Sequence, residues 1–183
     1  MLPGSHLAYL QGIEPAESNI QDSLLSCGDL PPFLRALLVA DGTVTLLLQA
    51  YFGESIVVDE VVQETLTLER SLPLLGMQPG DTALCRRVVL KGVGSHRVYA
   101  GAFSLLNPSR IHPDLFTQLI DERVGMGEVL RNAARGSFRE VLDIGRESEQ
   151  AVRRTYAVFV EQQPAILITE TFDIEVFEDR QPS

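Results

Sequence analysis

Residues 83–106 read ALCRRVVLKGVGSHRVYAGAFSLL, in which two largely apolar runs flank a joint that contains two glycines. The runs at 83–91 and 97–106 are rich in valine and aromatic residues, which favour strands. The joint at 92–96 has the length and the glycines of a hairpin loop. Because strands that are joined by a hairpin lie antiparallel, this stretch predicts an antiparallel sheet.

Further strands and helices are predicted on both sides of this hairpin. The composition predicts strands at 43–51, 55–65, 137–145, 153–161 and 165–172, with turns at 52–54 and 162–164. Helices are predicted at 113–123, at 128–135 and at 29–42, where Asp29 would cap the first turn and Gly42 would end the last. The sum is an α+β domain, a single antiparallel sheet of about six strands with helices covering one face.

The length and composition fit a single globular domain, since the chain has 183 residues of which 45% are hydrophobic. Residues 1–25 lack sustained periodicity, and we expect them to form a loosely packed N-terminal segment. The domain itself is expected to span residues 26–175. Residues 176–183 are predicted to form an acidic tail.

The formal net charge of −10 excludes some classes of partner. A chain this acidic repels nucleic-acid phosphates and anionic lipid surfaces, so we expect neither nucleic-acid nor membrane partners. The sequence has no apolar run of about 18 residues, and its first residues lack the features of a signal peptide, which makes a cytoplasmic protein the default expectation. An anionic substrate would bind only where arginines overcome the general field.

The residues that commonly hold metals are scattered. Cys27, Cys85, His6, His96 and His112 show no metal-ligand spacing, so we expect no metal and no cofactor. Two distant thiols in a cytoplasmic chain are expected to be reduced and structural. No segment resembles a serine or cysteine triad.

Two predicted strands carry a charge where alternation predicts a core position. Arg86 shares a face with Leu84 and Val88, and Glu170 shares a face with Ile168 and neighbouring apolar residues. Burying an unpaired charge costs several kcal/mol, so each side chain needs a partner. Either the two pair with each other or reach solvent at a sheet edge, or both line an internal cavity and face a ligand together.

A third candidate is the segment Gly125-Met126-Gly127-Glu128, which precedes a predicted helix. Backbone N–H groups at a helix start have no partner within the helix, and they favour anions such as carboxylates. The alternative interpretation is an ordinary turn between two helices.

The order and spacing of several segments resemble those of the chorismate lyase family, in particular its actinobacterial and cyanobacterial–plastid branch. The resemblance runs from about residue 34 to residue 172. The segments that carry it are LLVADGTVT (37–45), LCRRVVLKG (84–92), GMGEVL (125–130), RRTY (153–156) and PAILITE (164–170).

This resemblance implies a lyase that converts chorismate to 4-hydroxybenzoate and pyruvate without a cofactor. It implies that Arg86 binds a carboxylate of the substrate or product, and that Glu170 lies across an enclosed pocket near the ring hydroxyl, both as catalytic residues. Met126 would contribute backbone N–H contacts, and the region around Val44 would lie beside the site. The product would feed a quinone or another compound derived from 4-hydroxybenzoate, and plastoquinone is the expected destination in a cyanobacterial host.

One departure from the family pattern and one alternative function remain open. Some members carry a further arginine where this chain has Ala102, which leaves Arg131 and Arg135 as candidates to hold the second substrate carboxylate. The alternative function is a non-catalytic module of the same fold that binds an aromatic acid.

Overall fold

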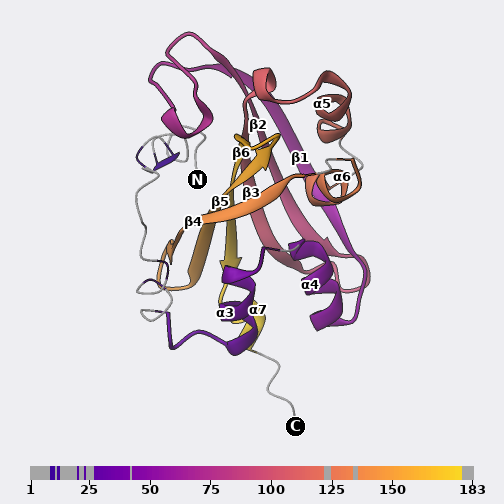
Figure 1. Ribbon diagram of the computed structural model, residues 1–183. Coiled ribbons are helices and arrows are strands. Elements are labelled where there is room, and N and C mark those ends of the chain that lie inside the picture. The colour runs from indigo at the N-terminus through magenta and orange to yellow at the C-terminus, as the bar shows by residue number, and fades with distance from the viewer. Residues whose placement is uncertain are drawn as a thin grey trace.

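Six antiparallel strands form one sheet in the order β1-β2-β3-β6-β5-β4, as seen in Figure 1. The computed structural model describes residues 9–10, 12, 20, 23, 27–41, 43–121, 125–133 and 136–178, with the backbone alone at 131–133. The strands are β1 (Ile56–Thr67), β2 (Thr82–Gly92), β3 (Val98–Leu106), β4 (Phe138–Arg146), β5 (Ala151–Val160) and β6 (Gln163–Asp173). The predicted hairpin is the pair β2–β3, and the predicted α+β class is confirmed.

The helices form two groups. They are α3 (Pro32–Val39), α4 (Val44–Phe52), α5 (Pro113–Leu119), α6 (Met126–Ala133) and α7 (Glu175–Glu178). Figure 1 shows α3, α4 and α7 at one end of the sheet, and α5 and α6 near the other end. Short 3₁₀ turns lie at Pro73–Leu75 (η1) and Pro108–Arg110 (η2).

The prediction of a strand at 43–51 is wrong, because this segment is helix α4. Its buried residues are Val44, Leu48 and Phe52, which recur every fourth position and form one helical face. Gly53 ends the helix with φ 70° and donates its N–H to the Gln49 carbonyl at 2.9 Å. The predicted turn at 52–54 is therefore the end of a helix. A short apolar run does not distinguish a buried helix from a strand by periodicity alone.

The first predicted helix is shorter than expected. Helix α3 begins after Pro31, which occupies the N-cap position without a side-chain capping bond. Asp29 does not cap it; its carboxylate pairs instead with Arg146 at 2.5 Å. The predicted end at Gly42 lies outside the described residues, and the chain already leaves the helix at Ala40, whose ψ is 130°.

The face of the sheet that the helices cover contains two apolar clusters. Residues of α3, α4 and α7 pack with Leu90, Ala100 and Phe172. Residues of α5 and α6 pack with Leu106 and Ile168, towards the other end of the strands. A third cluster lies on the opposite face, where Cys85, Leu105 and Leu167 contact the segment around η1. Because side chains alternate along each strand, the sheet has one apolar core on each of its two faces.

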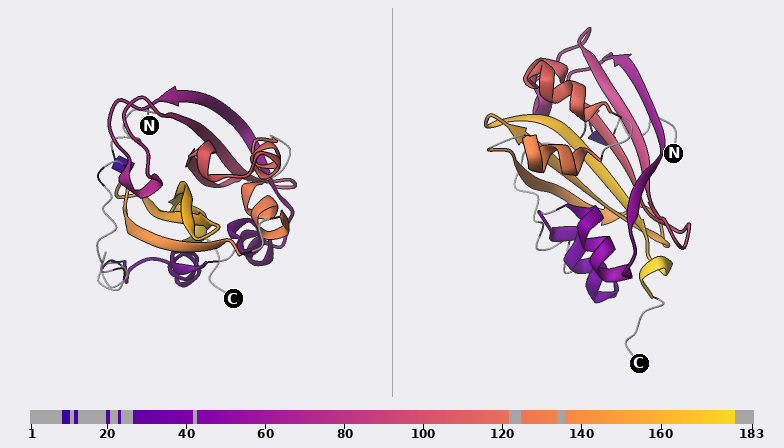
Figure 2. Two further views of the ribbon diagram at one scale, coloured as in Figure 1. Left: turned by 45° about the horizontal axis from the view of Figure 1, so that its top comes forward. Right: turned by 90° about the vertical axis from the view of Figure 1, so that its right-hand side faces the viewer.

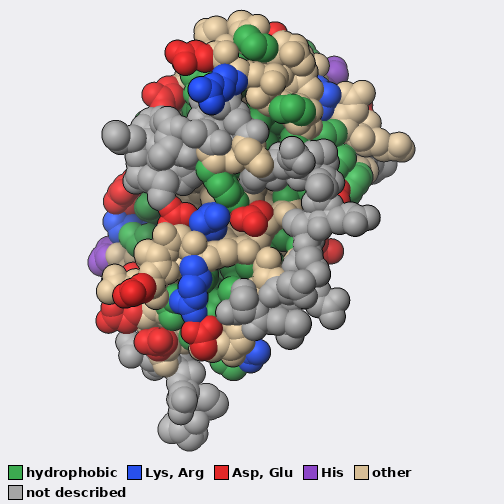
Figure 3. Space-filling view, turned by 90° about the vertical axis from the view of Figure 1, so that its left-hand side faces the viewer, with side chains coloured by type: hydrophobic (Ala, Val, Ile, Leu, Met, Phe, Trp, Pro, Cys, Tyr) green, Lys and Arg blue, Asp and Glu red, His purple; other side chains and the backbone are tan. Residues whose placement is uncertain are grey.

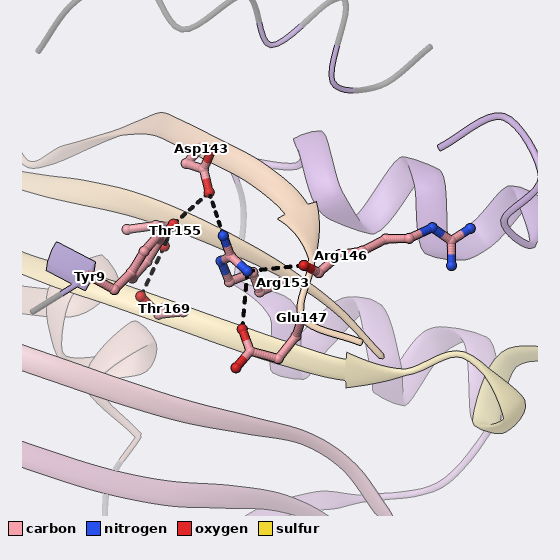
Figure 4. A network of polar contacts seen from close by, with 7 residues as sticks. All are labelled: Tyr9, Asp143, Arg146, Glu147, Arg153, Thr155 and Thr169. Atoms are coloured by element: carbon pink, nitrogen blue, oxygen red, sulfur yellow. Dashed lines mark hydrogen bonds and ion pairs between the residues drawn. The ribbon is translucent and has the colours of Figure 1, made fainter. Parts of the chain in front are cut away.

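The opposite face also binds part of the N-terminal segment, through the polar network in Figure 4. The Tyr9 hydroxyl donates to Asp143 at 2.5 Å, and the Arg153 guanidinium lies 4.4 Å from the centre of the Tyr9 ring. Arg153 also pairs with Glu147 at 3.1 Å, and Leu10 is fully buried. Burial raises the pKa of Tyr9, so its hydroxyl stays a donor. These residues attach the chain around Tyr9 to β4 and β5.

The predicted domain boundaries stay predictions, since residues 1–8 and 179–183 lie outside the described part. Within the predicted tail at 176–183, Phe177 belongs to helix α7 and is buried against α3 and α4. Cys27 and Cys85 are buried and form no disulfide. Burial raises the pKa of the Cys85 thiol to about 12, which disfavours the reactive thiolate.

The sheet is strongly curved, so that its two edge strands face the same space, as Figure 2 shows. Helix α6 lies in this space, close to both edges. A Cβ atom placed on Gly125 would lie 3.4 Å from Val58 of β1, and one on Gly127 would lie 3.8 Å from Arg139 of β4. Bulges in β1 and in β4 increase the local twist. This curvature converts one face of the sheet into a concave wall.

Candidate functional site

Arg86 and Glu170 both lie in the interior, as the alternation of their strands predicts. Their exposed fractions are 2% and 5%. They are not on neighbouring strands, because β3 lies between β2 and β6. Arg86 is opposite Ser104, and Glu170 is opposite Ala102. Both side chains nevertheless line one cavity over the concave face of the sheet.

The ion-pair partner of Glu170 is Arg154, which the sequence analysis did not single out. Arg154 is directly opposite Glu170 in the sheet and is 1% exposed. Its Nε donates to Glu170 Oε2 at 2.7 Å, and its Nη1 donates to the carbonyls of Leu37 and Ala40, both at 2.6 Å. The ion pair therefore also joins β5 and β6 to the end of helix α3. Alternation along β5 places either Arg153 or Arg154 inside, which was the available signal.

Tyr156 engages the other oxygen of the same carboxylate. Its hydroxyl donates to Glu170 Oε1 at 3.0 Å. Burial raises the pKa of Tyr156, and the negative charge of Glu170 adds to this effect. The phenol therefore remains a protonated donor. Arg154 and Tyr156 together hold both oxygens of Glu170 in place, while each oxygen keeps further acceptor capacity towards the cavity.

Arg86 is positioned by the end of helix α5. Its Nη1 donates to the carbonyl of Leu119, the last residue of that helix, at 2.5 Å. A cation at a helix C-terminus is stabilised by the local dipole. This contact orients the guanidinium, a group whose planar shape suits a bidentate contact with a carboxylate.

The start of helix α6 forms a second wall of the cavity. Gly125, Met126 and Gly127 line it, and the Gly125 carbonyl accepts from the N–H groups of Glu128 and Val129 at 2.9 and 3.2 Å. The N–H groups of Met126 and Gly127 belong to the first turn of α6. N–H groups in the first turn of a helix have no acceptor within that helix. Gly127 also allows close approach, because a Cβ there would lie 3.0 Å from the Thr43 methyl group.

Helix α4 supplies the third wall through Thr43, Val44 and Thr45. Its opposite end is attached to the β2–β3 hairpin by Glu54, which accepts from the N–H groups of Gly94 and Ser95, both at 3.0 Å. The hydroxyls of Ser95 and Tyr99 donate to the same carboxylate. These hydrogen bonds, with that of Tyr99 foremost, lower the pKa of Glu54 to about 2.

The cavity thus brings together all four of the residues that the sequence analysis selected: Arg86, Glu170, Met126 and Val44. It also contains Arg139 of β4, which the sequence analysis missed although alternation places it on the same face as Val141. Arg131 and Arg135, the earlier candidates for a second cation, have side chains outside the described part. Across the described residues, no group of three His, Cys, Asp or Glu side chains is arranged to hold a metal ion.

The cavity is small and lies beside a second one. Its volume is about 60 Å³, whereas ordinary ligand pockets have roughly 300–1,000 Å³. The adjoining cavity of about 210 Å³ shares the lining residues Thr43, Thr45, Val58 and Gly125. A ligand larger than a few atoms therefore needs both cavities, or an outward shift of α4 or α6.

The outer surface differs from this interior. The face in Figure 3 carries basic and acidic side chains next to one another, not a broad basic patch. On this face the basic side chains therefore do not form one continuous patch. Within the described residues, none of the helices combines the length and the apolar character that a membrane span requires.

The described residues thus form an α+β domain in which arginines and a paired carboxylate line a cavity over one concave antiparallel sheet. A family model described as "Chorismate pyruvate-lyase Rv2949c-like" matches residues 38–179. The chain therefore belongs to this chorismate pyruvate-lyase family, as its resemblance predicts.

Curated relatives agree with this membership. A chorismate pyruvate-lyase of Mycobacterium tuberculosis strain H37Rv is 27% identical over 163 residues, which cover 80% of this chain and 82% of the relative. The enzyme of the same name from Mycobacterium leprae is 28% identical over 160 residues, with 80% and 76% covered.

Solved structures support the fold. The chain is similar to PhnF from Mycobacterium smegmatis, with a TM-score of 0.57 and 16% identity over 75% of this chain and 66% of that one. It is also similar to the effector domain of PhnF alone, with a TM-score of 0.55 and 18% identity over 79% and 93%. At these identities the similarity concerns the architecture only.

Proposed function

We propose that the protein converts chorismate to 4-hydroxybenzoate and pyruvate in the cavity lined by Arg86 and Glu170. The observation that carries the proposal is that a buried cation and a buried carboxylate, two strands apart in the sheet, line one cavity with the first turn of α6. Membership of the chorismate pyruvate-lyase family supports the same reaction.

The reaction requires that the protein orient chorismate and compensate the charges of its carboxylates. In chorismate an enolpyruvyl ether and a hydroxyl occupy adjacent carbons of a dihydroaromatic ring. The carbon that carries the hydroxyl group loses its hydrogen as a proton, and the bond between the neighbouring ring carbon and the ether oxygen breaks. The enolpyruvate that is released then takes up a proton and becomes pyruvate. The ring becomes aromatic, so no net oxidation or reduction takes place.

Arg86 is proposed to bind the ring carboxylate, which substrate and product share. Its guanidinium is held by the Leu119 carbonyl and is almost completely removed from water. A charge-assisted bidentate contact is stronger in such an environment than at the surface. Arg86 would thereby fix one end of the ring.

Glu170 is proposed to orient the hydroxyl at the opposite end of the ring. Its oxygens already accept from Arg154 and Tyr156, and the remaining acceptor capacity can receive the ring hydroxyl. A carboxylate that is held so firmly acts as a fixed anion that selects one conformer of the substrate. Orientation of this kind lowers the activation barrier of the reaction, because the substrate loses its conformational and rotational entropy when it binds and not in the chemical step.

The walls formed by α4 and α6 are proposed to exclude water and to open for entry. The N–H groups of Met126 and Gly127 would then hydrogen-bond an oxygen of the substrate. Exclusion of water strengthens each electrostatic contact in the cavity. Because the two cavities are small, we expect substrate entry to displace at least one of these walls.

The test is to incubate the purified protein with chorismate and to measure both products, pyruvate by a coupled dehydrogenase assay and 4-hydroxybenzoate by chromatography. We expect both to form in equal amounts. Arg86→Ala and Glu170→Gln should each lower kcat/KM at least about 100-fold, as the loss of a charged contact in the transition state would. Formation of 4-hydroxybenzoate at the parental rate in both variants would show that this site is wrong.

A second candidate function uses the same cavity, because Arg86 and Glu170 could hold an anionic ligand there without any reaction. Under this alternative the chain binds an aromatic acid in the same cavity without converting it. The two functions differ in one measurement, because a binder would show calorimetric affinity for 4-hydroxybenzoate but would release no pyruvate from chorismate.

Within the main proposal, the reaction takes place in the cytoplasm and 4-hydroxybenzoate supplies the ring of a quinone, plastoquinone in a cyanobacterial host. Deleting the gene should abolish the incorporation of ring-labelled chorismate into quinone. Supplied 4-hydroxybenzoate should restore quinone synthesis, and failure of this rescue would argue against the downstream role.

A further inference from the structure

Arg139 is a second arginine that lines the cavity, and it lies on the edge strand β4. The strands β3, β6 and β5 separate it from Arg86 on β2. Both side chains nevertheless line the same cavity. The curvature of the sheet in Figure 2 accounts for this, because it turns the outermost strands towards one another.

The guanidinium of Arg139 is placed beside the first turn of α6. Its Nη2 lies 3.8 Å from the position of a Cβ on Gly127, and its Nη1 donates to the Asp41 carbonyl at 3.3 Å. That bond is long, and within the described ranges no carboxylate forms an ion pair with Arg139. Most of its five N–H donors are therefore available to an acceptor in the cavity.

The carboxylate that lines this cavity does not compensate the charge of Arg139. Among the described lining residues that carboxylate is Glu170, and Arg154 already pairs with it from behind. A small molecule that is bound at Arg86 would compensate Arg139 if it had a second carboxylate.

The position of each arginine fits one end of such a molecule. In the proposed function the ring carboxylate lies at Arg86 and the ring hydroxyl lies at Glu170. The enolpyruvyl arm is attached to the carbon next to the hydroxyl, so the second carboxylate lies towards Glu170. Strand β6, which carries Glu170, is separated from β4 by β5 alone. Arg139 is therefore on the side where the second carboxylate extends.

We infer that Arg139 binds the carboxylate of the enolpyruvyl arm and thereby makes the site selective for the dicarboxylate substrate over the monocarboxylate product. This inference rests on the proposed function. It assigns the role for which Arg131 and Arg135 were candidates to a residue on a strand instead. The position of Arg139 also favours release of the product, because 4-hydroxybenzoate has no second carboxylate that Arg139 could bind.

The test compares Arg139→Gln with the parent protein on both ligands. Loss of a charge-assisted contact should raise the KM for chorismate about 10- to 100-fold, with the Kd for 4-hydroxybenzoate unchanged within about twofold. Arg139→Lys keeps the charge but loses the planar fork, so it should give an intermediate KM. Arg146→Gln is the matched control, because it removes a charge from the exposed end of the same strand, and it should behave like the parent.

Equal weakening of both ligands, or of neither, in Arg139→Gln would overturn the inference. Thermal unfolding of each variant shows whether the fold is retained, and Arg139→Lys replaces Arg139→Gln in the comparison if the latter does not fold. If the parent protein forms no pyruvate, the proposed function fails by itself. Calorimetric Kd values for chorismate and 4-hydroxybenzoate would then still show whether Arg139 selects the dicarboxylate.

Discussion

The buried pair Arg154–Glu170 should be a main determinant of stability as well as of the site. We consider the substitution Arg154→Met, which keeps most of the volume of the side chain but removes its charge. Glu170 then loses the donor that lies 2.7 Å from its Oε2. The carbonyls of Leu37 and Ala40 lose a donor as well.

The expected cost follows from the burial of both partners. The side chains of Arg154 and Glu170 are 1% and 7% exposed, so water does not replace the lost contact. Removing one partner of a buried ion pair costs about 3–5 kcal/mol, because the remaining charge stays buried without compensation. For a domain of 150–250 residues, this corresponds to a decrease in Tm of about 6–20 °C.

The assay is urea unfolding followed by circular dichroism, together with calorimetric Tm values. The double variant Arg154→Met/Glu170→Leu is the informative control, since it removes both charges and should be more stable than Arg154→Met alone. An unfolding free energy of Arg154→Met within about 1 kcal/mol of the parent would refute the reasoning. So would a double variant that is less stable than the single one.

Two further predictions concern the walls of the cavity. The pKa of Glu54 is lowered from 4.5 to about 2, so its stabilising contribution is present above pH 4.5 and is lost as the pH falls through about 2. Glu54→Gln should therefore unfold more easily than the parent near neutral pH, and this difference, measured by urea unfolding, should disappear near pH 2; a difference that is independent of pH would contradict it. At the start of α6, Gly127→Ala places a Cβ 3.0 Å from the Thr43 methyl group, whereas Gly125→Ala places one at 3.4 Å from Val58. We expect Gly127→Ala to weaken calorimetric binding of 4-hydroxybenzoate more than Gly125→Ala does, and the opposite order would argue against close approach of the two helices.

The sequence alone determined the features that depend on local periodicity. A strand alternates its side chains between two faces whatever its neighbours are, so the pattern around Arg86 and that around Glu170 placed both charges in the interior. The glycine joint at 92–96 likewise determined that β2 and β3 are adjacent and antiparallel. With these two facts, and with the family resemblance, the α+β class and four residues that line the cavity were predictable, namely Arg86, Glu170, Met126 and Val44.

The tertiary structure decided which residues meet. Residues 43–51 form a helix because Val44, Leu48 and Phe52 are buried together, which an unbroken apolar run does not reveal. Arg154 neutralises Glu170 because β5 and β6 pair in one particular register, and Arg139 reaches the cavity only because the sheet curves. Alternation specifies a face, but strand order, register and curvature arise from packing between distant segments, and no local pattern contains them.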